Sequence, residues 1–208
     1  MKRALAKRTL DIVLGSGLLI LAAPLILIAA LAILLEDGRP AIFRQLRAGK
    51  QGRGFTLHKL RTMHRNQLRV DLVGQVGADH ELLLRTGRWL RRLKIDELPQ
   101  LLNVVRGDMS LVGPRPTVPE QVAGYSAFEK RRLEVEPGMT GWAQVHGNVQ
   151  LPWPDRILLD VWYVDNWTIG LDLGVLARTV IVLFFGERVD RRALEDARLH
   201  AAGADRIG

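Results

Sequence analysis

The hydrophobic residues of this chain are gathered in one long run near the N-terminus. From Ile12 to Leu35 the sequence has 24 consecutive uncharged residues, which as a helix would be about 36 Å long at 1.5 Å per residue. That length exceeds the roughly 30 Å hydrocarbon core of a bilayer, whereas the apolar region of a signal peptide is about 7–15 residues long. The run therefore predicts a membrane segment rather than a signal peptide or a buried core helix.

Pro24 lies in the middle of this run, where it removes a backbone donor and kinks or breaks a helix. Two topologies are open: a spanning helix with a kink, or a helix–break–helix that enters and leaves the membrane by the same face. Four basic residues precede the run and five follow it within 39–53, and basic residues gather on the cytoplasmic side of membrane segments. This symmetry favours a re-entrant segment over residues 1–38 with both ends in the cytoplasm.

The rest of the chain has the pattern of an α+β domain that is mostly helical with a short β-hairpin. Residues 39–186 are expected to form this domain, followed by a polar tail at 187–208 in which a surface helix would fit. Two strands joined by the loop 47–53 predict the hairpin, and the stretch 107–119 is rich in Gly and Pro and predicts an ordered loop. The strands are expected at 41–46 and 54–60, and the helices at 79–94, 97–106, 118–135, 155–167 and 171–185. The Trp residues before the last of these are most simply explained as core packing, and an aromatic belt at the membrane interface is the alternative.

Composition narrows the chemistry. The 208 residues include no cysteine, which excludes a disulfide scaffold, a thiolate zinc site, an iron–sulfur cluster and a cysteine nucleophile. Thirty Lys and Arg against 22 Asp and Glu give a net charge of +8. That excess leaves three kinds of partner open: nucleic acid, an anionic membrane surface, or a phosphorylated substrate.

Asp96 and Glu97 are the most informative acidic pair. Pro99 follows them, and proline favours the first turn of a helix, so both carboxylates are expected at a helix start. Acidic residues at such a place often serve only as caps, because the helix dipole favours them there. The alternative is a nucleophilic carboxylate beside a second one that holds Mg²⁺, an arrangement that suits a phosphorus electrophile.

Basic residues surround this pair in the sequence, and a guanidinium fork fits phosphate oxygens. Arg115 stands between two prolines that fix its backbone, which favours a role in binding. Each of the others alone is more easily explained as a surface charge. They are Lys59 and Arg61 at the end of the second strand, Arg88, Arg91 and Arg92 before the acidic pair, and Arg106 after it.

Taken together, the motifs of this chain resemble those of the bacterial sugar transferases, monotopic phosphoglycosyl transferases that start the assembly of O-antigen, capsule, exopolysaccharide or glycoprotein glycans. The resemblance extends from about Lys7 to about Thr179. It rests on an ordered set: Lys7-Arg8 with Asp11, Phe43-x-Gln45-x-x-Arg47-x-Gly49, the segments 59–63 (KLRTM), 96–101 (DELPQL), 107–116 (GDMSLVGPRP), 137–145 (PGMTGWAQV) and 160–165 (DVWYVD).

The resemblance implies an activity. Such enzymes transfer a sugar 1-phosphate from a nucleoside diphosphate sugar, usually a UDP-sugar, to a polyprenyl phosphate such as undecaprenyl phosphate, and release UMP. By resemblance, Asp96 would attack phosphorus and carry a covalent phosphosugar, and Glu97 would support the cofactor Mg²⁺. The substrate-binding residues would be Lys59, Arg61, Arg91, Arg115, Gln144 and Asp160. The family also implies a membrane segment that is re-entrant at Pro24, a location in the bacterial inner membrane with the catalytic domain on the cytoplasmic face, and no nucleic acid partner.

The chain departs from the family pattern at three places. Ala23 replaces a common Ser before the proline of the membrane segment, Glu136 replaces an arginine before Pro-Gly, and residues 146–149 read HGNV instead of Asn-Gly-Arg-Asn. These changes bear on the identity of the sugar. From charge alone, the rival hypothesis is a basic membrane-tethered protein that binds nucleic acid or anionic lipid; it would need no Asp-Glu pair and would show steep salt dependence.

Overall fold

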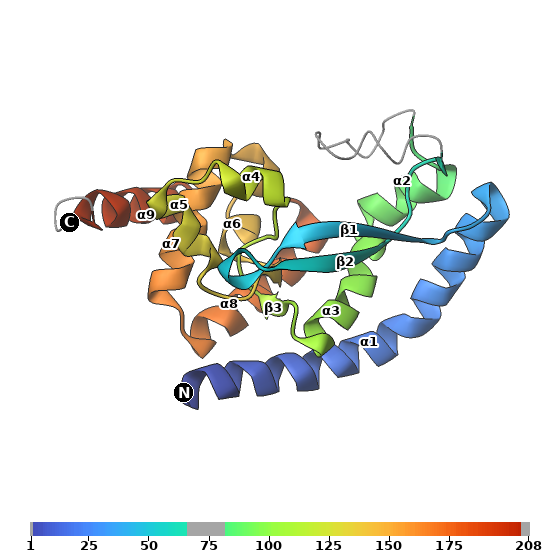
Figure 1. Ribbon diagram of the computed structural model, residues 1–208, viewed down its shortest axis with the longest axis horizontal. Helices are drawn as coiled ribbons and strands as arrows, with labels where there is room; N and C mark the ends of the chain where they lie inside the picture. Colours follow the sequence, from blue (N-terminus) through green and yellow to red (C-terminus); the bar gives the residue numbers. More distant parts are fainter. Residues whose placement is uncertain (1, 66–81, 205–208) are drawn as a thin grey trace.

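The computed structural model of the protein describes residues 2–65 and 82–204. Within these ranges the fold is mostly helical with two small two-stranded sheets (Figure 1), which confirms the predicted α+β class. One long helix, α1, runs along the lower edge of the view, and the remaining elements lie on one side of it.

Helix α1 spans Lys2–Asp37 without interruption, with Pro24 inside it. The predicted break of the backbone at Pro24 is therefore wrong. A proline removes a single N–H donor and displaces one carbonyl, and the Leu, Ile and Ala residues around Pro24 favour the helix strongly enough to continue through it. The ribbon of α1 is curved rather than straight (Figure 1), so the proline is accommodated within a bent helix.

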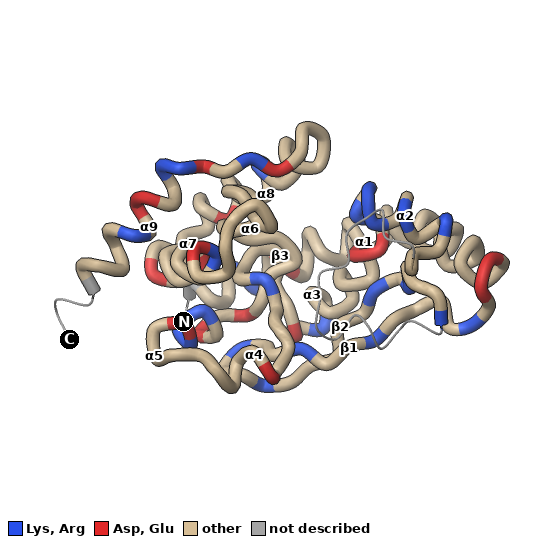
Figure 2. Tube along the Cα trace, turned by 90° about the horizontal axis from the view of Figure 1, so that it is seen from above, with Lys and Arg blue, Asp and Glu red and all other residues tan. Residues whose placement is uncertain are grey.

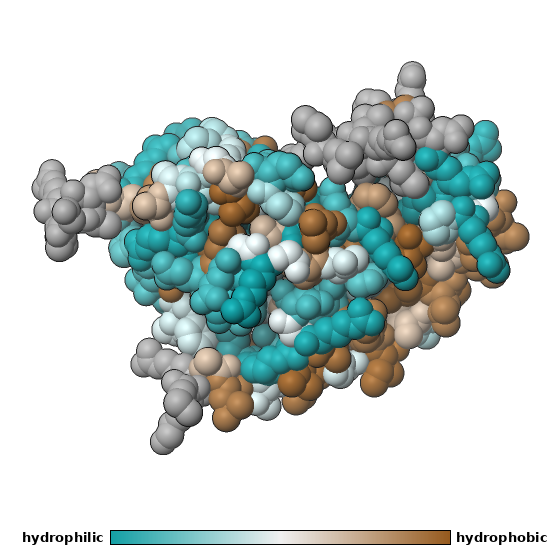
Figure 3. Space-filling view, in the orientation of Figure 1, coloured by the Kyte–Doolittle hydropathy of each residue, from teal (hydrophilic) through white to brown (hydrophobic). Residues whose placement is uncertain are grey.

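One face of α1 packs on the domain, but many of its large apolar side chains are exposed in the described structure. Only 11% of the most apolar 18-residue stretch of α1 is buried. By length and composition the helix is able to cross a membrane. The exposed residues include Leu21 and Leu35, 78% and 80% accessible. Hydrophobic surface accordingly follows the lower edge of the molecule in Figure 3, where Figure 1 places α1. Exposed apolar surface of this extent marks a membrane or protein contact.

The predicted hairpin is confirmed. Strand β1 (Ile42–Ala48) pairs antiparallel with β2 (Gly54–Leu60), in a register that sets Ile42 opposite Leu60. A 3₁₀ turn, η1 (Lys50–Gly52), joins them. Gly52 has a φ of +74°, in the left-handed region that favours glycine at a tight turn.

The segment predicted as a loop at 107–119 contains a short strand. β3 (Ser110–Val112) pairs in parallel with β4 (Gly138–Thr140) and is fully buried. Three residues between a glycine-ended helix and a Gly-Pro turn give too short a pattern to be recognised as a strand. The sheet draws the segments 107–116 and 137–145 together, although they are far apart in the sequence.

Two predicted helices around the acidic pair are shorter than expected. Helix α2 covers Arg85–Arg92, because Leu83 forms a β-bridge with Met63 instead of joining the helix. Residues 79–81 of the predicted helix lie outside the described residues. The helix expected at 97–106 is a 3₁₀ helix, η4 (Ile95–Gln100), followed by α3 (Leu101–Arg106), which ends as predicted at Gly107 with a φ of +98°.

The single helix predicted over 118–135 is wrong. The structure has α4 (Pro119–Ala123), α5 (Ala127–Lys130) and the 3₁₀ turn η5 (Arg131–Leu133). Ser126 and Glu129 form a reciprocal capping box that begins α5, and a cap of this kind starts a new helix instead of continuing the old one.

The C-terminal third is helical, as predicted. After α6 (Trp142–Val145) and η6 (Asn148–Gln150) come α7 (Trp153–Asn166) and α8 (Ile169–Phe185). The polar tail forms α9 (Arg191–Ala204), whose buried face packs with residues of α6 and α7. The tail is therefore part of the folded domain rather than an appendage.

Candidate active site

The acidic pair lies in the first turn of η4, which packs against β2, α1 and α2. Figure 2 shows blue basic positions along β1, β2 and α2 in this part of the molecule. The residue before η4, Lys94, has a φ of +57°. A left-handed conformation at a lysine is unfavourable and is kept only where the surroundings enforce it, often at functional sites. Here it turns the chain from the end of α2 so that Asp96 and Glu97 follow at once.

Glu97 is held by two cations. Arg115 donates hydrogen bonds to its carboxylate from both terminal nitrogens, from Nη2 to Oε1 at 2.6 Å and from Nη1 to Oε2 at 3.3 Å. Lys59 Nζ, from β2, is 3.1 Å from Oε1. Burial alone would raise the pKa of Glu97, but the charges of Arg115 and Lys59 hold it well below its usual range. Glu97 is therefore a permanent anion at neutral pH.

Asp96 differs from its neighbour. Its residue is 7% accessible and, among the described residues, its Oδ1 atom is buried without any hydrogen-bond partner. Burial raises the pKa of Asp96, while the charge of Lys59 opposes the rise and that of Glu97 adds to it. An unpartnered carboxylate oxygen is costly to keep in the interior, and a catalytic role is one physical reason for a protein to keep it there.

Arg115 is positioned by a buried framework. Arg132 Nη2 donates to the Arg115 carbonyl at 2.9 Å and to Asp160 Oδ2 at 2.6 Å, and its Nη1 donates to the Tyr125 hydroxyl at 2.8 Å. Asp160, predicted to bind substrate, is thus engaged by Arg132 and 3% accessible. It supports Arg115 from behind, and its predicted substrate contact stays a prediction.

Arg132 is a member of the site that no motif marked. In the sequence it is one of several charges in a segment predicted as a continuous helix, and only the three-dimensional fold brings it under the Arg115 loop. The backbone at Gly113, two residues before Arg115, passes close to the backbone at Glu136. A Cβ at Gly113 would lie 2.5 Å from the Glu136 carbonyl oxygen. Glycine is required there by the packing of two chain segments.

The other predicted binding residues are more dispersed. Arg61 is 1% accessible and bonds to the end of α1, through the Asp37 carboxylate and the Gly38 carbonyl at 2.6 Å. Arg91 Nε donates to Thr62 at 2.8 Å, and its charge acts on Asp96. Gln144 donates to the Met139 carbonyl at 3.1 Å, and its Oε1 lacks a partner in the described part of the chain. The structure places Arg61 in a structural contact and leaves its predicted substrate contact a prediction.

The acidic pair has the donors that Mg²⁺ prefers. Over the described ranges no cluster of three or more acidic, His or Cys side chains gathers in one place. Mg²⁺ needs no such cluster, because it keeps several waters and binds one or two carboxylates together with substrate phosphates. The ionised carboxylate of Glu97, next to Asp96, is a ligand of this kind.

Comparison with known proteins shows the family of the chain. The family model described as bacterial sugar transferase matches residues 2–186, nearly the whole chain. The chain belongs to the bacterial sugar transferase family. This confirms the resemblance drawn from the motifs, and the match reaches slightly beyond both limits proposed from them.

Named relatives give this sugar transferase its context. It is 43% identical over 185 residues to the uncharacterized sugar transferase EpsL of Bacillus subtilis, covering 89% of this chain and 90% of that protein. It is 47% identical to a UDP-glucose:undecaprenyl-phosphate glucose-1-phosphate transferase of Caulobacter vibrioides, over 85% of this chain and 68% of the relative. An undecaprenyl-phosphate glucose phosphotransferase of Komagataeibacter xylinus is 42% identical over 85% of this chain, which spans only 35% of that longer protein.

Two of the departures from the family pattern have structural partners in this sugar transferase. Glu136 forms an ion pair with Lys50 Nζ at 3.0 Å. Asn148 donates from Nδ2 to Glu187 Oε1 at 2.6 Å, which ties η6 to the segment that precedes α9. Both substituted positions therefore have partners of their own in the fold.

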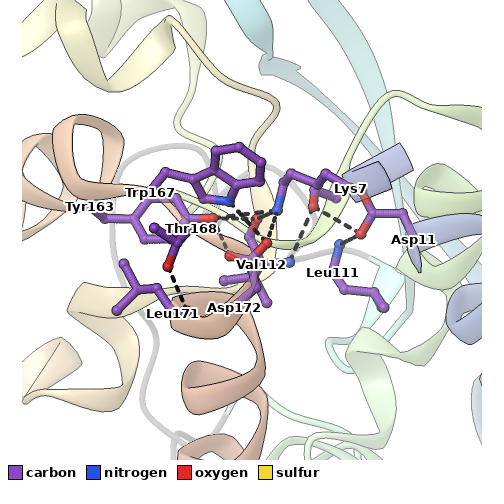
Figure 4. Close-up of polar contacts among 10 residues, drawn as sticks. Lys7, Asp11, Leu111, Val112, Tyr163, Trp167, Thr168, Leu171 and Asp172 are labelled. Carbon is purple, nitrogen blue, oxygen red and sulfur yellow. Dashed lines mark hydrogen bonds and ion pairs between the residues drawn. The ribbon is translucent and has the colours of Figure 1, made fainter. Parts of the chain in front are cut away.

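A second buried polar cluster joins the start of α1 to the domain (Figure 4). Lys7 Nζ lies 2.7 Å from Asp172 Oδ2 and 2.9 Å from the Val112 carbonyl. Tyr163 donates to Asp172 Oδ1 at 2.6 Å, and Trp167 Nε1 donates to Oδ2 at 3.0 Å. Burial raises the pKa of Tyr163, so its hydroxyl stays a donor. We call Lys7, Tyr163, Trp167 and Asp172 the anchor cluster.

Proposed function

We propose that this sugar transferase moves a sugar 1-phosphate from a UDP-sugar to undecaprenyl phosphate, the first membrane step of a bacterial glycoconjugate. The observation that carries the proposal is the buried oxygen of Asp96, which has no hydrogen-bond partner among the described residues, beside a Glu97 carboxylate that two cations hold ionised. The relatives named as undecaprenyl-phosphate glucose transferases support the class of donor and acceptor.

In the first step, an Asp96 oxygen attacks the phosphorus that carries the sugar. The bond between that phosphorus and the bridging oxygen breaks, and UMP leaves with the electron pair. In the second step, a phosphate oxygen of the lipid attacks the same phosphorus, and the bond to Asp96 breaks and restores the free carboxylate. Splitting the transfer in this way lets one site serve two substrates in turn.

The cations around Glu97 suit this reaction. Both substrates are anions, and Arg115 with Lys59 supplies positive charge next to Asp96. The Arg115 side chain is 41% accessible, so it reaches solvent as well as Glu97. Its planar fork binds phosphate oxygens in the same bidentate way as the carboxylate.

We further propose that Glu97 holds Mg²⁺ beside the nucleophile Asp96. The ion would supply a compact positive charge against the phosphate oxygens as UMP departs. Glu97→Gln should weaken the dependence of activity on Mg²⁺ concentration, because the carboxylate ligand of the ion is lost. An unchanged Mg²⁺ titration in this variant would contradict the assignment.

We propose that the curved helix α1 lies in one leaflet of the inner membrane with both of its ends on the cytoplasmic face, where the domain also lies. A straight 36-residue helix would be about 54 Å long, well beyond the bilayer core. Yet Lys7 near its start pairs with Asp172, and Asp37 at its end pairs with Arg61. A domain bound at both ends of α1 lies on one side of the membrane, which supports the re-entrant arrangement over the spanning one. The exposed apolar residues at the end of α8, such as Phe184 and Phe185, would meet the same membrane surface.

Single cysteines test this topology cleanly, since the chain has none of its own. Ala4 and Arg39 are exposed positions on either side of the apolar run. Ala4→Cys and Arg39→Cys should both be protected from an impermeant maleimide in intact spheroplasts and both react after lysis. Labelling of only one of the two in intact spheroplasts would establish a spanning helix.

The activity itself is tested without a lipid acceptor. Purified protein given a UDP-sugar and Mg²⁺ should release one UMP per enzyme molecule in a burst, because the first step can proceed alone. A basic membrane-tethered binding protein would release none. Release of UMP only when lipid phosphate is present would contradict the two-step route.

A further inference from the structure

A third arginine lies close to the framework behind Arg115 and is not used by the proposed reaction. Arg132, which donates to the Arg115 carbonyl at 2.9 Å, also lies 5.1 Å from the ring centre of Trp153. Arg156 is in the first turns of α7 and is partly buried. Its Nε donates to the Leu151 carbonyl at 2.9 Å, and its guanidinium lies 5.9 Å from the ring centre of Trp153. These two contacts fix the stem and one face of the guanidinium, and neither uses its terminal nitrogens.

Arg156 differs from its neighbours in how its charge is balanced. Arg115 is paired with Glu97, and Arg132 with Asp160. Within residues 2–65 and 82–204, Arg156 forms no ion pair, and its two terminal nitrogens donate no hydrogen bond to the protein. A guanidinium that is partly withdrawn from water and lacks a carboxylate is well suited to bind an external anion.

Each of the two carboxylates whose charge acts on Arg156 has one oxygen engaged with another residue. Glu187 acts on Arg156 through its charge, but its Oε1 accepts from Asn148. Asp160 also acts on Arg156, and its carboxylate is bonded to Arg132. Burial lowers the pKa of Arg156, and the positive charge of Arg115 lowers it further. Arg132 connects the two residues, because it donates to the Arg115 carbonyl and lies against the same Trp153 ring as Arg156. An anion bound by both Arg115 and Arg156 would balance their charges.

We propose that Arg156, together with Arg115, binds a phosphate group of a substrate. The proposal rests on the proposed function, which supplies two phosphate-bearing substrates: the diphosphate of the sugar donor and the terminal phosphate of the polyprenyl lipid. The planar fork of Arg156 would engage two oxygens of that phosphate, and its stacking on Trp153 would hold the fork in place.

Two variants and one control separate binding from structure. Arg156→Gln removes the charge, and Arg156→Lys keeps the charge without the fork. Arg198→Gln is the matched control, because the Arg198 side chain is 58% accessible and pairs with Asp155, the neighbour of Arg156 in α7. Donor KM, acceptor KM, kcat and the melting temperature are measured for each protein.

A rise of roughly tenfold or more in one KM is expected for Arg156→Gln, with partial recovery in Arg156→Lys and no change in Arg198→Gln. A rise in donor KM, together with a slower UMP burst, assigns the phosphate to the nucleotide sugar. A rise in acceptor KM with an unchanged burst assigns it to the lipid. Unchanged values of both, or equal values in the lysine and glutamine variants with a lowered melting temperature, would overturn the proposal and leave Arg156 a packing residue.

A direct binding measurement keeps the proposal separate from the activity. Titration of the wild type and of Arg156→Gln with UDP, and with a short polyprenyl phosphate in micelles, needs no turnover. If the wild type transfers no sugar phosphate, the proposed function fails. A weaker affinity of Arg156→Gln for one of these ligands would still support the phosphate site, and equal affinities for both would overturn it.

Discussion

The anchor cluster and the site around Asp96 are both built on buried carboxylates and basic side chains, yet their hydrogen bonding differs. In the anchor cluster both oxygens of Asp172 have donors, from Tyr163, Lys7 and Trp167. Beside Glu97, by contrast, Oδ1 of Asp96 is buried with no donor in the described part of the protein. Every carboxylate oxygen of Asp172 is thus hydrogen-bonded, whereas one carboxylate oxygen of Asp96 has no donor among the described residues.

This difference separates a structural role from a chemical one. A satisfied buried network fixes a geometry and has nothing left to bind. An unsatisfied carboxylate costs folding energy, and that cost is tolerated where the atom meets a substrate. The anchor cluster holds α1 on the domain, and the incomplete site leaves one nucleophilic oxygen available.

The largest expected effect comes from Asp96. Asp96→Asn should lower the turnover rate at least about a thousandfold, because an amide does not attack phosphorus. Asp196→Asn, at an exposed position of α9, is the control and should leave the rate unchanged. Turnover by Asp96→Asn near that of the control would remove Asp96 as the nucleophile.

Asp172 should give the opposite result, a loss of stability without a loss of chemistry. Asp172→Asn leaves Lys7 buried without its counter-charge, a change that costs about 3–5 kcal/mol. Denaturant unfolding in detergent should show this decrease in the free energy of unfolding. The fraction that remains folded should still form the phosphosugar adduct on Asp96; a folded variant that forms none would show that the two clusters are not separate in function.

Arg115 should have an intermediate effect. Arg115→Ala should lower kcat/KM by roughly ten- to a hundredfold, equivalent to about 1.4–3 kcal/mol of a charge-assisted contact. Arg115→Lys should recover part of it, because the charge is kept and the fork is lost. Steady-state kinetics with the donor varied decides, and wild-type values in Arg115→Ala would make this residue a surface charge.

The smallest effect is a change of stability with pH at Asp96. Burial raises the pKa of Asp96 above that in the unfolded chain, so its contribution to stability is fully present at acid pH and is lost as the pH rises through the raised pKa. Asp96→Asn should therefore melt higher than wild type at neutral pH, and the gap should close as the pH is lowered. A gap that widens on acidification would show that the carboxylate is stabilised in the fold.

Local elements could be predicted from the sequence where the pattern was strong. The hairpin, α7, α8 and the end of α3 at Gly107 follow from alternation, helical spacing and a left-handed glycine. Prediction failed where one cap or one pairing decided the outcome. Ser126 divides a predicted helix, and β3 is a strand only because β4 lies beside it.

The candidate site, too, could be predicted only in part from the sequence. The motifs located Asp96, Glu97, Lys59 and Arg115, and the structure joins the last three by direct hydrogen bonds next to Asp96. Members of the same motifs can nonetheless have other partners, since Arg61 bonds to Asp37, and Asp160 to Arg132. A motif marks the residues, and only packing shows whether each of them meets substrate or supports its neighbours.

The measurement closest to the central claim is the mass of the protein after reaction with donor alone. Wild type incubated with a UDP-sugar and Mg²⁺ and quenched before lipid is added should gain the mass of one sugar phosphate, and peptide mapping should place it on Asp96. Addition of polyprenyl phosphate should then remove the added mass. A protein that turns over the donor while its mass stays unmodified, or carries the adduct on another residue, would contradict the account.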